Sequence, residues 1–325
     1  LQMTWVMPNH SSLVSEFIFV GFSELPQMRT LLFVLVLFMY TASLAGNAII
    51  TTVIKLNATL HTPMYYFLIN LSLLEICYTT AIVPKMLASL VSKNGKISLW
   101  GCATQMYFFT LFGITECCLL AAMAYDRFVA LCKPLHYNVI MNRSVCAQLS
   151  MVSWSVGVMV GLGQTNYVFS LSYCGPNRIN HFFCDIPPLL TLACGATSMN
   201  AIAVYMVAVL FITVPFLLIL TSYVYIIISI LRMPSAEGRR KAFSTCSSHL
   251  IVVSLFYGSG IITYLRPKSS YSAESDKFLA LFYTVVTSML NPIIYTLRNK
   301  EVQVALKRTM RNKLYVRECN KCLLL

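Results

Sequence analysis

The stretch MAYDRFVALCKPLHY, residues Met123–Tyr137, sets an acid and a base side by side at the end of a long apolar run. The run, residues 97–125, contains one charged side chain, Glu116. An Asp126–Arg127 pair where an apolar helix meets water can act as a two-state contact, because the acid can hold the guanidinium in one state and release it to a partner in the other. The alternative is an interfacial ion pair that only marks the membrane boundary. The local sequence leaves both interpretations open.

The composition of the 325 residues is that of a membrane protein. Hydrophobic residues make up 58% of the chain and charged residues 11%, and the mean hydropathy is +0.71. Soluble domains carry about 25% charged residues, so this chain has too few charges to cover a soluble globule, whereas it can cover a helix bundle that faces lipid. Apolar runs recur from start to finish, which predicts one all-α membrane unit.

Seven windows of low charge each supply the roughly 20 apolar residues that a membrane-spanning helix needs. They are residues 30–54, 62–84, 97–125, 144–166, 200–231, 242–265 and 278–297. An odd number of spans places the two termini on opposite sides of the membrane. We expect an extracellular N-terminus 1–29, a seven-helix domain 30–298 and a cytoplasmic tail 299–325. Residues 299–313 are basic and amphipathic, which predicts a short eighth helix on the inner leaflet.

The distribution of Lys and Arg predicts the direction of insertion. With the N-terminus outside, the cytoplasmic segments hold 16 of the 24 Lys and Arg residues, and such an excess marks the cytoplasmic side. The net charge of +13 therefore indicates a membrane-facing surface, and no nucleic-acid motif accompanies it. This orientation puts the glycosylation acceptor Asn9 outside. It also puts Cys102, Cys174, Cys184 and Cys194 there, where disulfides persist, and their three pairings stay open.

Five motifs occur in one order along the chain. They are LHTPMYYFL (Leu60–Leu68), the opening stretch, Ser222–Tyr223, KAFSTCSSHL (Lys241–Leu250) and LNPIIYTLRNK (Leu290–Lys300). Together they resemble the odorant (olfactory) receptors of the rhodopsin-like G-protein-coupled receptor family, and the long second extracellular loop resembles the tetrapod-type (class II) branch. The chain departs from the family pattern at Tyr66, Phe128 and Ser288, none of which alters the Asp-Arg pair.

The resemblance implies a receptor in the plasma membrane of olfactory sensory neuron cilia. Such a receptor binds a small volatile odorant and activates a stimulatory G protein to raise cAMP, and accessory trafficking proteins are further candidate partners. Arg127 would turn toward the G protein in the active state, while Asp126 would restrain it at rest. The other residues implied in coupling and switching are Tyr223, Lys241, His249, Asn291, Pro292 and Tyr295. By the same resemblance the disulfides are Cys102–Cys184 and Cys174–Cys194.

Four of these residues have alternative interpretations. Lys241 and His249 are 8 residues apart and so share one helix face, which predicts a G-protein contact surface or a polar latch to the helix of residues 97–125. The alternative is ordinary positive charge on the cytoplasmic side, although His249 lies within the span. Tyr223 and Tyr295 can instead be members of the interfacial aromatic belt.

Glu75 and Glu116 are acids within two of the predicted spans. A carboxylate in the membrane must face the interior and find a partner or take a proton. In rhodopsin-like receptors the first acid belongs to a sodium site, so the resemblance implies that Na⁺ or a proton here stabilises the inactive state. The alternative is that both acids are neutral and hydrogen-bond Asn47, Ser72 or Asn291.

The outer halves of the spans should form the ligand pocket. In the span 97–125, the i, i+3, i+4 spacing of one helix face selects Met106, Phe109, Thr110, Gly113 and Ile114. The candidates in the later spans are Val207, Phe211, Tyr257, Ile261, Tyr264 and Thr284. None of them is charged, which predicts a small, neutral, mostly apolar ligand. The alternative for each residue is plain helix packing.

Other classes of protein are less well supported by the sequence. A non-olfactory rhodopsin-like receptor shares part of the pattern. An ion-coupled transporter using Glu75 and Glu116 would show internal repeats, and an enzyme would need a nucleophile with its base or a metal-binding motif such as His-Glu-x-x-His. We find neither, so we expect no enzymatic activity and no cofactor other than Na⁺. Near the C-terminus, Cys319 and Cys322 are candidates for lipidation.

Overall fold

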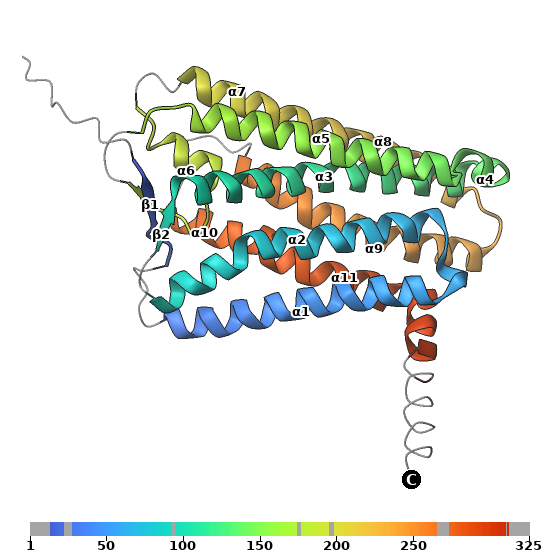
Figure 1. Cartoon of the computed structure of the whole chain (residues 1–325). Helices are drawn as coiled ribbons and strands as arrows, with labels where there is room; N and C mark the ends of the chain where they lie inside the picture. The colour runs from blue at the N-terminus through green and yellow to red at the C-terminus, as the bar shows by residue number, and fades with distance from the viewer. Residues whose placement is uncertain are drawn as a thin grey trace, which may run out of the picture.

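The computed structural model describes residues 14–22, 28–92, 95–173, 177–194, 198–264, 273–309 and 311. Over these residues seven helical spans are long and apolar enough to cross a membrane, and they lie side by side in one bundle (Figure 1). They are α1 (Arg29–Leu56), α2 (Pro63–Ser92), α3 (Leu99–Cys132), α5 (Arg143–Phe169), α7–η4–α8 (Ser198–Ala208, Val209–Thr213, Val214–Leu231), α9 (Ala236–Tyr264) and α10–η6–α11 (Ala273–Leu281, Phe282–Val286, Thr287–Arg298). The predicted all-α, seven-helix membrane fold is confirmed.

Short helices connect or follow these spans. They are η2 (Ala58–Leu60), η3 (Pro134–His136), α4 (Tyr137–Ile140) and α6 (Ile186–Leu190). Residues 300–309 form one more helix, whose start is capped by Asn299, because its Oδ1 accepts hydrogen bonds from the backbone N–H of Glu301 at 3.0 Å and Val302 at 3.3 Å. This helix turns sharply away from the bundle (Figure 1). Its place on the inner leaflet stays a prediction.

Several helices extend beyond the apolar windows that predict them. Helix α2 continues through Pro84 to Ser92. Helix α3 has 34 residues, which at 1.5 Å per residue gives about 51 Å, more than the ~30 Å thickness of the hydrocarbon core. Asp126 and Arg127 therefore lie within the last two turns of α3 and are held by its backbone hydrogen bonds.

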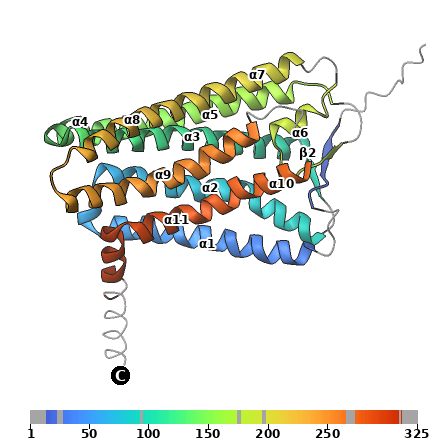
Figure 2. The same ribbon diagram turned by 180° about the vertical axis from the view of Figure 1, so that it is seen from behind.

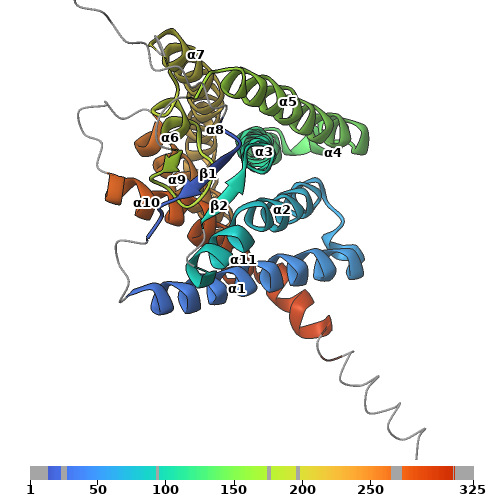
Figure 3. The same cartoon turned by 60° about the vertical axis from the view of Figure 1, so that its left-hand side comes forward.

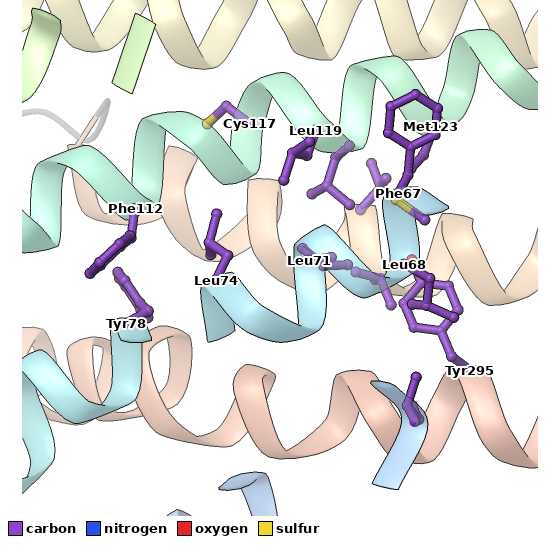
Figure 4. Close-up of a cluster of buried hydrophobic side chains, with 14 of the residues drawn as sticks. Phe67, Leu68, Leu71, Leu74, Tyr78, Phe112, Cys117, Leu119, Met123 and Tyr295 are labelled. Carbon is purple, nitrogen blue, oxygen red and sulfur yellow. The ribbon is translucent and has the colours of Figure 1, made fainter. Parts of the chain in front are cut away.

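Helix α3 is the central element of the bundle and packs against α2, α5, α8 and α9 (Figure 3). Between α2 and α3, apolar side chains of the buried core point toward one another, among them Leu71, Leu74, Leu119 and Met123 (Figure 4). Seen from behind, α11 lies between α1 and α9 (Figure 2). Burial of this core is non-directional and scales with apolar area, so the close approach of particular helices needs a separate cause.

Glycines supply that cause at two places. A Cβ on Gly46 of α1 would lie 2.9 Å from Cγ of Pro292. A Cβ on Gly157 of α5 would lie 2.6 Å from the backbone oxygen of Leu111. Because real Cβ atoms do not come this close, the missing side chains let α1 approach α11 and let α5 approach α3. Small residues at helix interfaces are the usual device in membranes, where helix association depends on packing.

The outward faces of the bundle carry large exposed apolar side chains, for example Phe38 on α1, Met159 on α5 and Leu218 on α8. In water such a surface would be an aggregation hazard. In a bilayer it is the face that lipid covers, since the helices satisfy their own backbone hydrogen bonds.

A three-stranded sheet closes one end of the bundle. Strand β1 (Glu16–Phe19) lies between β2 (Lys96–Ser98) and β3 (Arg178–Ile179). It pairs antiparallel with β2, Glu16 opposite Ser98, and parallel with β3, Ile18 opposite Arg178. The sequence predicts no strand in residues 1–29, so this sheet is a new finding. It lies at the opposite end from the helix 300–309 (Figure 1), and which end faces outward stays a prediction.

Candidate functional site

A cavity lies between α3, α5, α9 and the two spans that contain π-helical turns, α7–η4–α8 and α10–η6–α11. It is next to the end of the bundle that carries the sheet. It holds about 820 Å³ of empty space, its opening included. Its walls are mainly aliphatic and aromatic, with hydroxyl and amide groups between them, and none of the described residues that line it is charged. Such a space suits a small molecule whose recognition depends on apolar surface and one or two polar contacts.

Seven of the eleven predicted pocket residues line this cavity: Phe109, Thr110, Gly113, Ile114, Val207, Tyr257 and Tyr264. Four lie elsewhere. Met106 is fully buried in the cluster beneath the sheet, with Cys102 and Phe17. Phe211, Ile261 and Thr284 are replaced in the lining by their immediate neighbours Ile212, Gly260 and Tyr283.

Two of these one-residue shifts have a common cause. Val209–Thr213 and Phe282–Val286 are π-helical turns, which hold one residue more per turn than an α-helix, so the faces beyond them turn by about 100°. Spacing that assumes 3.6 residues per turn therefore continues from Val207 to Phe211, four residues on, whereas Ile212 lines the cavity. Thr284 is fully buried and donates to the backbone oxygen of Ala280 at 2.6 Å.

Sequence reasoning missed several lining residues, including Tyr78 on α2, Val160 and Gln164 on α5, and Ile186 on α6. Val160 and Gln164 are one helical turn apart and so share one face of α5. Gln164 is a polar residue in an apolar span, and this was the sequence signal that could have identified it. Ile186 follows Cys184, whose disulfide to Cys102 joins the loop to the start of α3. That link predicts that residues just after Cys184 reach the pocket.

The loop before α6, which we call the lid, leads directly into the lining residue Ile186. The disulfide Cys102–Cys184 closes a separation of 82 residues with a Cα–Cα distance of 5.5 Å. Gln105 strengthens the same junction, because its Nε2 donates to the backbone oxygen of Ala81 at 3.1 Å and its Oε1 accepts from the backbone N–H of Cys184 at 3.0 Å. The lid is thus held to α2 and α3 by covalent and hydrogen bonds.

Asp185 is the buried acid of this lid. It is 3% exposed, and burial raises its pKa to about 6. The hydroxyls of Tyr264 and Tyr283 donate to its carboxylate, each at 3.3 Å. Asp185 is not itself among the lining residues, so the tyrosines that do line the cavity stand between the acid and a ligand.

His181 in the same lid is also buried, and its pKa is lowered to about 3 by burial and by the positive charge of Lys277. Its ring stacks on Phe182 with centroids 4.8 Å apart. His181 is therefore a neutral aromatic packing residue at physiological pH, which leaves Asp185 as the lid group that titrates nearest to neutrality.

The structure brings Glu75 and Glu116, the two acids within the predicted spans, close together. Glu75 and Glu116 are 1% and 2% exposed and close enough to interact electrostatically. Asn291 donates from Nδ2 to Oε1 of Glu75, although 216 residues separate them. Oε2 of Glu75 and Oδ1 of Asn291 have no hydrogen-bond partner among the described residues. Asn47 bonds instead to Ser43 and to the backbone oxygen of Ser288.

At the end of α3 away from the sheet, the Asp-Arg pair is arranged differently from the expectation. The ion pair found among the described residues is Lys96–Glu16, so Asp126 does not restrain Arg127 by direct contact. The Tyr137 hydroxyl donates to Oδ1 of Asp126 at 2.9 Å, and Arg127 reaches Sδ of Met64 on α2. Adjacent residues on a helix point about 100° apart, which explains why each finds its own partner.

Burial and the neighbouring Asp126 raise the pKa of Tyr137, so its phenol keeps its proton and remains a donor. Arg127 also borders a small gap together with Met64, Leu68 and Tyr295. Asp126 therefore connects α3 to Tyr137 at the start of α4, and Arg127 connects α3 to Met64 on α2.

A second contact joins α8 to α9. The Tyr223 hydroxyl and Nδ1 of His249 are 2.8 Å apart, and the two rings stack at 5.8 Å. Both side chains are buried, 3% and 1% exposed. His249 thus pairs with Tyr223 on α8, and its role as a latch to α3 stays a prediction. The hydroxyl of Tyr295 on α11 is buried without a hydrogen-bond partner among the described residues.

Some predicted residues fall outside what can be placed. Asn9, Cys174, Cys319 and Cys322 lie outside the described residues, as does the side chain of Lys241. Pro292 is described and lies inside α11, packed against Gly46.

Comparison with known proteins identifies the family. The sequence profile of the olfactory receptor family matches residues 36–313. The chain is 57% identical to human olfactory receptor 10A7 over 95% of this chain and 97% of that one. It is 56% identical to human olfactory receptor 10A4 over 93% and 96%, and 55% identical to human olfactory receptor 10AG1 over 91% and 98%. This chain belongs to the olfactory receptor family.

The matched region of this olfactory receptor includes the cavity, the acid pair and the contacts of Asp126, Arg127 and Tyr223, whereas strand β1 precedes it. The predicted family is confirmed, and so is a multi-pass membrane protein. Because the relatives are receptors, an enzyme and an ion-coupled transporter are set aside.

Proposed function

We propose that this olfactory receptor binds a small, neutral, mostly apolar volatile molecule in the cavity and activates a stimulatory, olfactory-type G protein to raise cAMP. The observation that carries the proposal is the lining of the cavity, which is apolar and aromatic with no charge on its described residues. An ionised ligand would lose its hydration there without gaining an opposite charge. An apolar ligand gains about 25 cal/mol for each Å² of surface that it removes from water.

The lid supports the same ligand class. Its one acid near the cavity, Asp185, already accepts from the hydroxyls of Tyr264 and Tyr283. An amine would have to displace both donors to reach the carboxylate. A neutral odorant leaves these hydrogen bonds intact, so it binds without that cost.

For signalling, the proposal assigns the output to the end of α3. In this structure Arg127 is directed to Met64 on α2, and Tyr223 ties α8 to α9 through His249. Outward movement of α9 would break the second contact and open the gap beside Arg127. The guanidinium could then meet a G-protein segment, which is the two-state behaviour that switching needs.

We also propose that Na⁺ binds at the acid pair and favours the inactive state. The residues fit a hard cation, because carboxylate and amide oxygens can coordinate one. Oε2 of Glu75 and Oδ1 of Asn291 are buried and have no hydrogen-bond partner among the described residues. Two adjacent carboxylates repel each other unless a cation or a shared proton lies between them. When bound, the ion would supply that positive charge, while Asn291 holds Glu75 in place.

The central experiment measures cAMP in cells that express the receptor and are exposed to a panel of volatile compounds. We expect odorant-dependent cAMP that Arg127→Ala abolishes at equal surface expression. Arg143→Ala is the matched control, since Arg143 is exposed at the start of α5. A response that survives Arg127→Ala, or an ion current that needs no G protein, would contradict the proposal.

The sodium proposal has its own test. Glu116→Gln removes one carboxylate with little change of shape, so basal cAMP should rise and lose its dependence on external Na⁺. Glu237→Gln, at an exposed position in the first turn of α9, controls for the loss of a negative charge. If Glu116→Gln leaves both basal activity and its Na⁺ dependence unchanged, the ion has no role.

For location, we propose the plasma membrane of olfactory cilia, with the N-terminus outside and glycosylated at Asn9. An epitope at the N-terminus should be labelled on intact cells, and glycosidase should shift the wild type but not Asn9→Gln on a gel. Labelling only after permeabilisation would reverse the assigned orientation.

A further inference from the structure

Gln164 on α5 is a polar side chain that the fold leaves unsatisfied beside the cavity. It is 8% exposed and lines the cavity. Its Oε1 is buried and has no hydrogen-bond partner among the described residues. Oxygen and nitrogen of an amide are assigned from the hydrogen-bond network and can be exchanged by a flip. Either assignment leaves the amide with unused hydrogen-bonding capacity next to an apolar space.

Thr110 on α3 provides a second such group. It lines the same cavity, and its hydroxyl is buried without a partner among the residues that the structure describes. A hydroxyl is both donor and acceptor. One turn along α3, Gly113 has nothing within 4 Å of the place where a Cβ would stand, so the space beside Thr110 is open to a ligand.

Four other hydroxyls of the cavity already have hydrogen-bond partners. Tyr257 donates to the backbone oxygen of Cys117 at 3.0 Å. Ser259 donates to the backbone oxygen of Leu255 at 2.7 Å. Tyr264 and Tyr283 donate to Asp185. Among the described lining residues, the buried side-chain polar atoms without a hydrogen-bond partner are Oγ1 of Thr110 on α3 and Oε1 of Gln164 on α5.

We infer that Gln164 and Thr110 form the polar subsite of the ligand cavity, and that they select odorants carrying a free hydroxyl group. This inference rests on the proposed odorant-binding function. A ligand O–H donates to the amide oxygen of Gln164, and the hydroxyl of Thr110 is a second hydrogen-bonding group in the same cavity. An ether, ester or hydrocarbon of the same skeleton has no O–H to donate, so with the amide oriented as in this structure it leaves Oε1 of Gln164 unpaired. A site built to hydrogen-bond an OH discriminates strongly against analogues that lack it.

The experiment measures EC50 for cAMP with four alcohols, octanol, cyclohexanol, menthol and benzyl alcohol, each beside its methyl ether. On the wild-type receptor we expect the alcohol of an active pair to be about tenfold more potent than its ether, which corresponds to about 1.4 kcal/mol. In Gln164→Met, which keeps the length of the side chain and removes the amide, the ratio of the two EC50 values should fall toward one. Gln164→Leu serves as a second replacement.

Because both members of a pair are measured on the same cells, their ratio is independent of surface expression. Thr110→Val should also lower the ratio, since it removes the hydroxyl with little change of shape. Thr165→Val is the matched control: its hydroxyl is likewise buried and unpartnered, but Thr165 is not among the lining residues, so the ratio should not change.

Two outcomes overturn the inference while leaving the proposed function intact: ethers as potent as alcohols on the wild type, or an unchanged ratio in both Gln164 variants. If a receptor shown by antibody labelling to be at the surface responds to no volatile compound in this panel or a wider one, the proposed function fails, and the inference fails with it.

Discussion

The contact between α5 and α3 gives a graded prediction from three glycines of one helix. A Cβ on Gly157 would lie 2.1 Å from Oγ1 of Thr115 and 2.6 Å from the backbone oxygen of Leu111. On Gly161 it would lie 3.2 Å from the backbone oxygen of Tyr107, and on Gly163 it would meet nothing within 4 Å. Alanine at these positions therefore adds the same methyl group to three different spaces.

The magnitudes follow from two opposing effects. Replacing a helical glycine by alanine stabilises the helix by about 1 kcal/mol, and Gly163→Ala should gain this fully. At Gly157 the backbone oxygen of Leu111 cannot move aside by changing a rotamer, so α5 must separate from α3, and overpacking of this kind costs about 1–3 kcal/mol. Gly161→Ala should fall between them, because its contacts require shifts of only a few tenths of an ångström.

The assay is thermal unfolding of the purified receptor in detergent, followed with a thiol-reactive dye. Cys117 and Cys246 are free and buried, so they react only as the bundle opens. The midpoints should rank Gly163→Ala above wild type, then Gly161→Ala, then Gly157→Ala. Adding Thr115→Ala to Gly157→Ala should restore only part of the loss, since the contact with Leu111 remains. Equal midpoints for Gly157→Ala and Gly163→Ala would refute the packing argument.

Three further predictions use the same thermal assay. Because the pKa of Asp185 is raised from 3.8 to about 6, the folded receptor binds more protons than the unfolded chain between these pH values. Stability should therefore fall as pH rises through this window, by at most about 3 kcal/mol. Asp185→Asn should flatten this pH dependence, and an unchanged dependence in the variant would contradict the burial argument. Tyr223→Phe should lower the midpoint of thermal unfolding and the free energy of unfolding, the latter by about 1–3 kcal/mol, because it leaves His249 without its hydroxyl partner. A midpoint equal to that of the wild type would show that this contact does not contribute to stability. Cys102→Ser should destabilise by on the order of 4 kcal/mol, because the disulfide to Cys184 closes a separation of 82 residues, and Cys77→Ser, at an exposed free thiol, should have little effect.

The seven spans are predictable because each is a local property. About 20 successive apolar residues suffice to cross a membrane, whatever lies elsewhere in the chain. Helix ends are less predictable, since a helix continues wherever its hydrogen bonds can form. Thus α3 runs on through Asp126 and Arg127, and α2 runs on through Pro84.

The ligand cavity is predictable only in part. On α3, regular spacing correctly selects Thr110, Gly113 and Ile114 as lining residues. Met106 on α3 and Ile261 on α9 are absent from the lining, and on the spans that contain π-helical turns Ile212 and Tyr283 replace their neighbours. One added residue in a turn changes which side chain faces inward, and the amino-acid sequence does not indicate where such a turn occurs.

By itself the sequence determined the class of this protein: a membrane chain of seven helices, with an Asp-Arg pair ending the third and motifs that place it among the olfactory receptors. Only the tertiary structure decided which groups meet. It directs Arg127 to Met64 and pairs Tyr137 with Asp126. It brings Asn291 to Glu75 across 216 residues, adds residues 16–19 to a sheet with two distant loops, and leaves Gln164 unpartnered beside the cavity. The physical reason is that crossing a membrane depends on local composition, whereas a hydrogen bond depends on the position of both partners to within a few tenths of an ångström, which is settled only when all the helices pack.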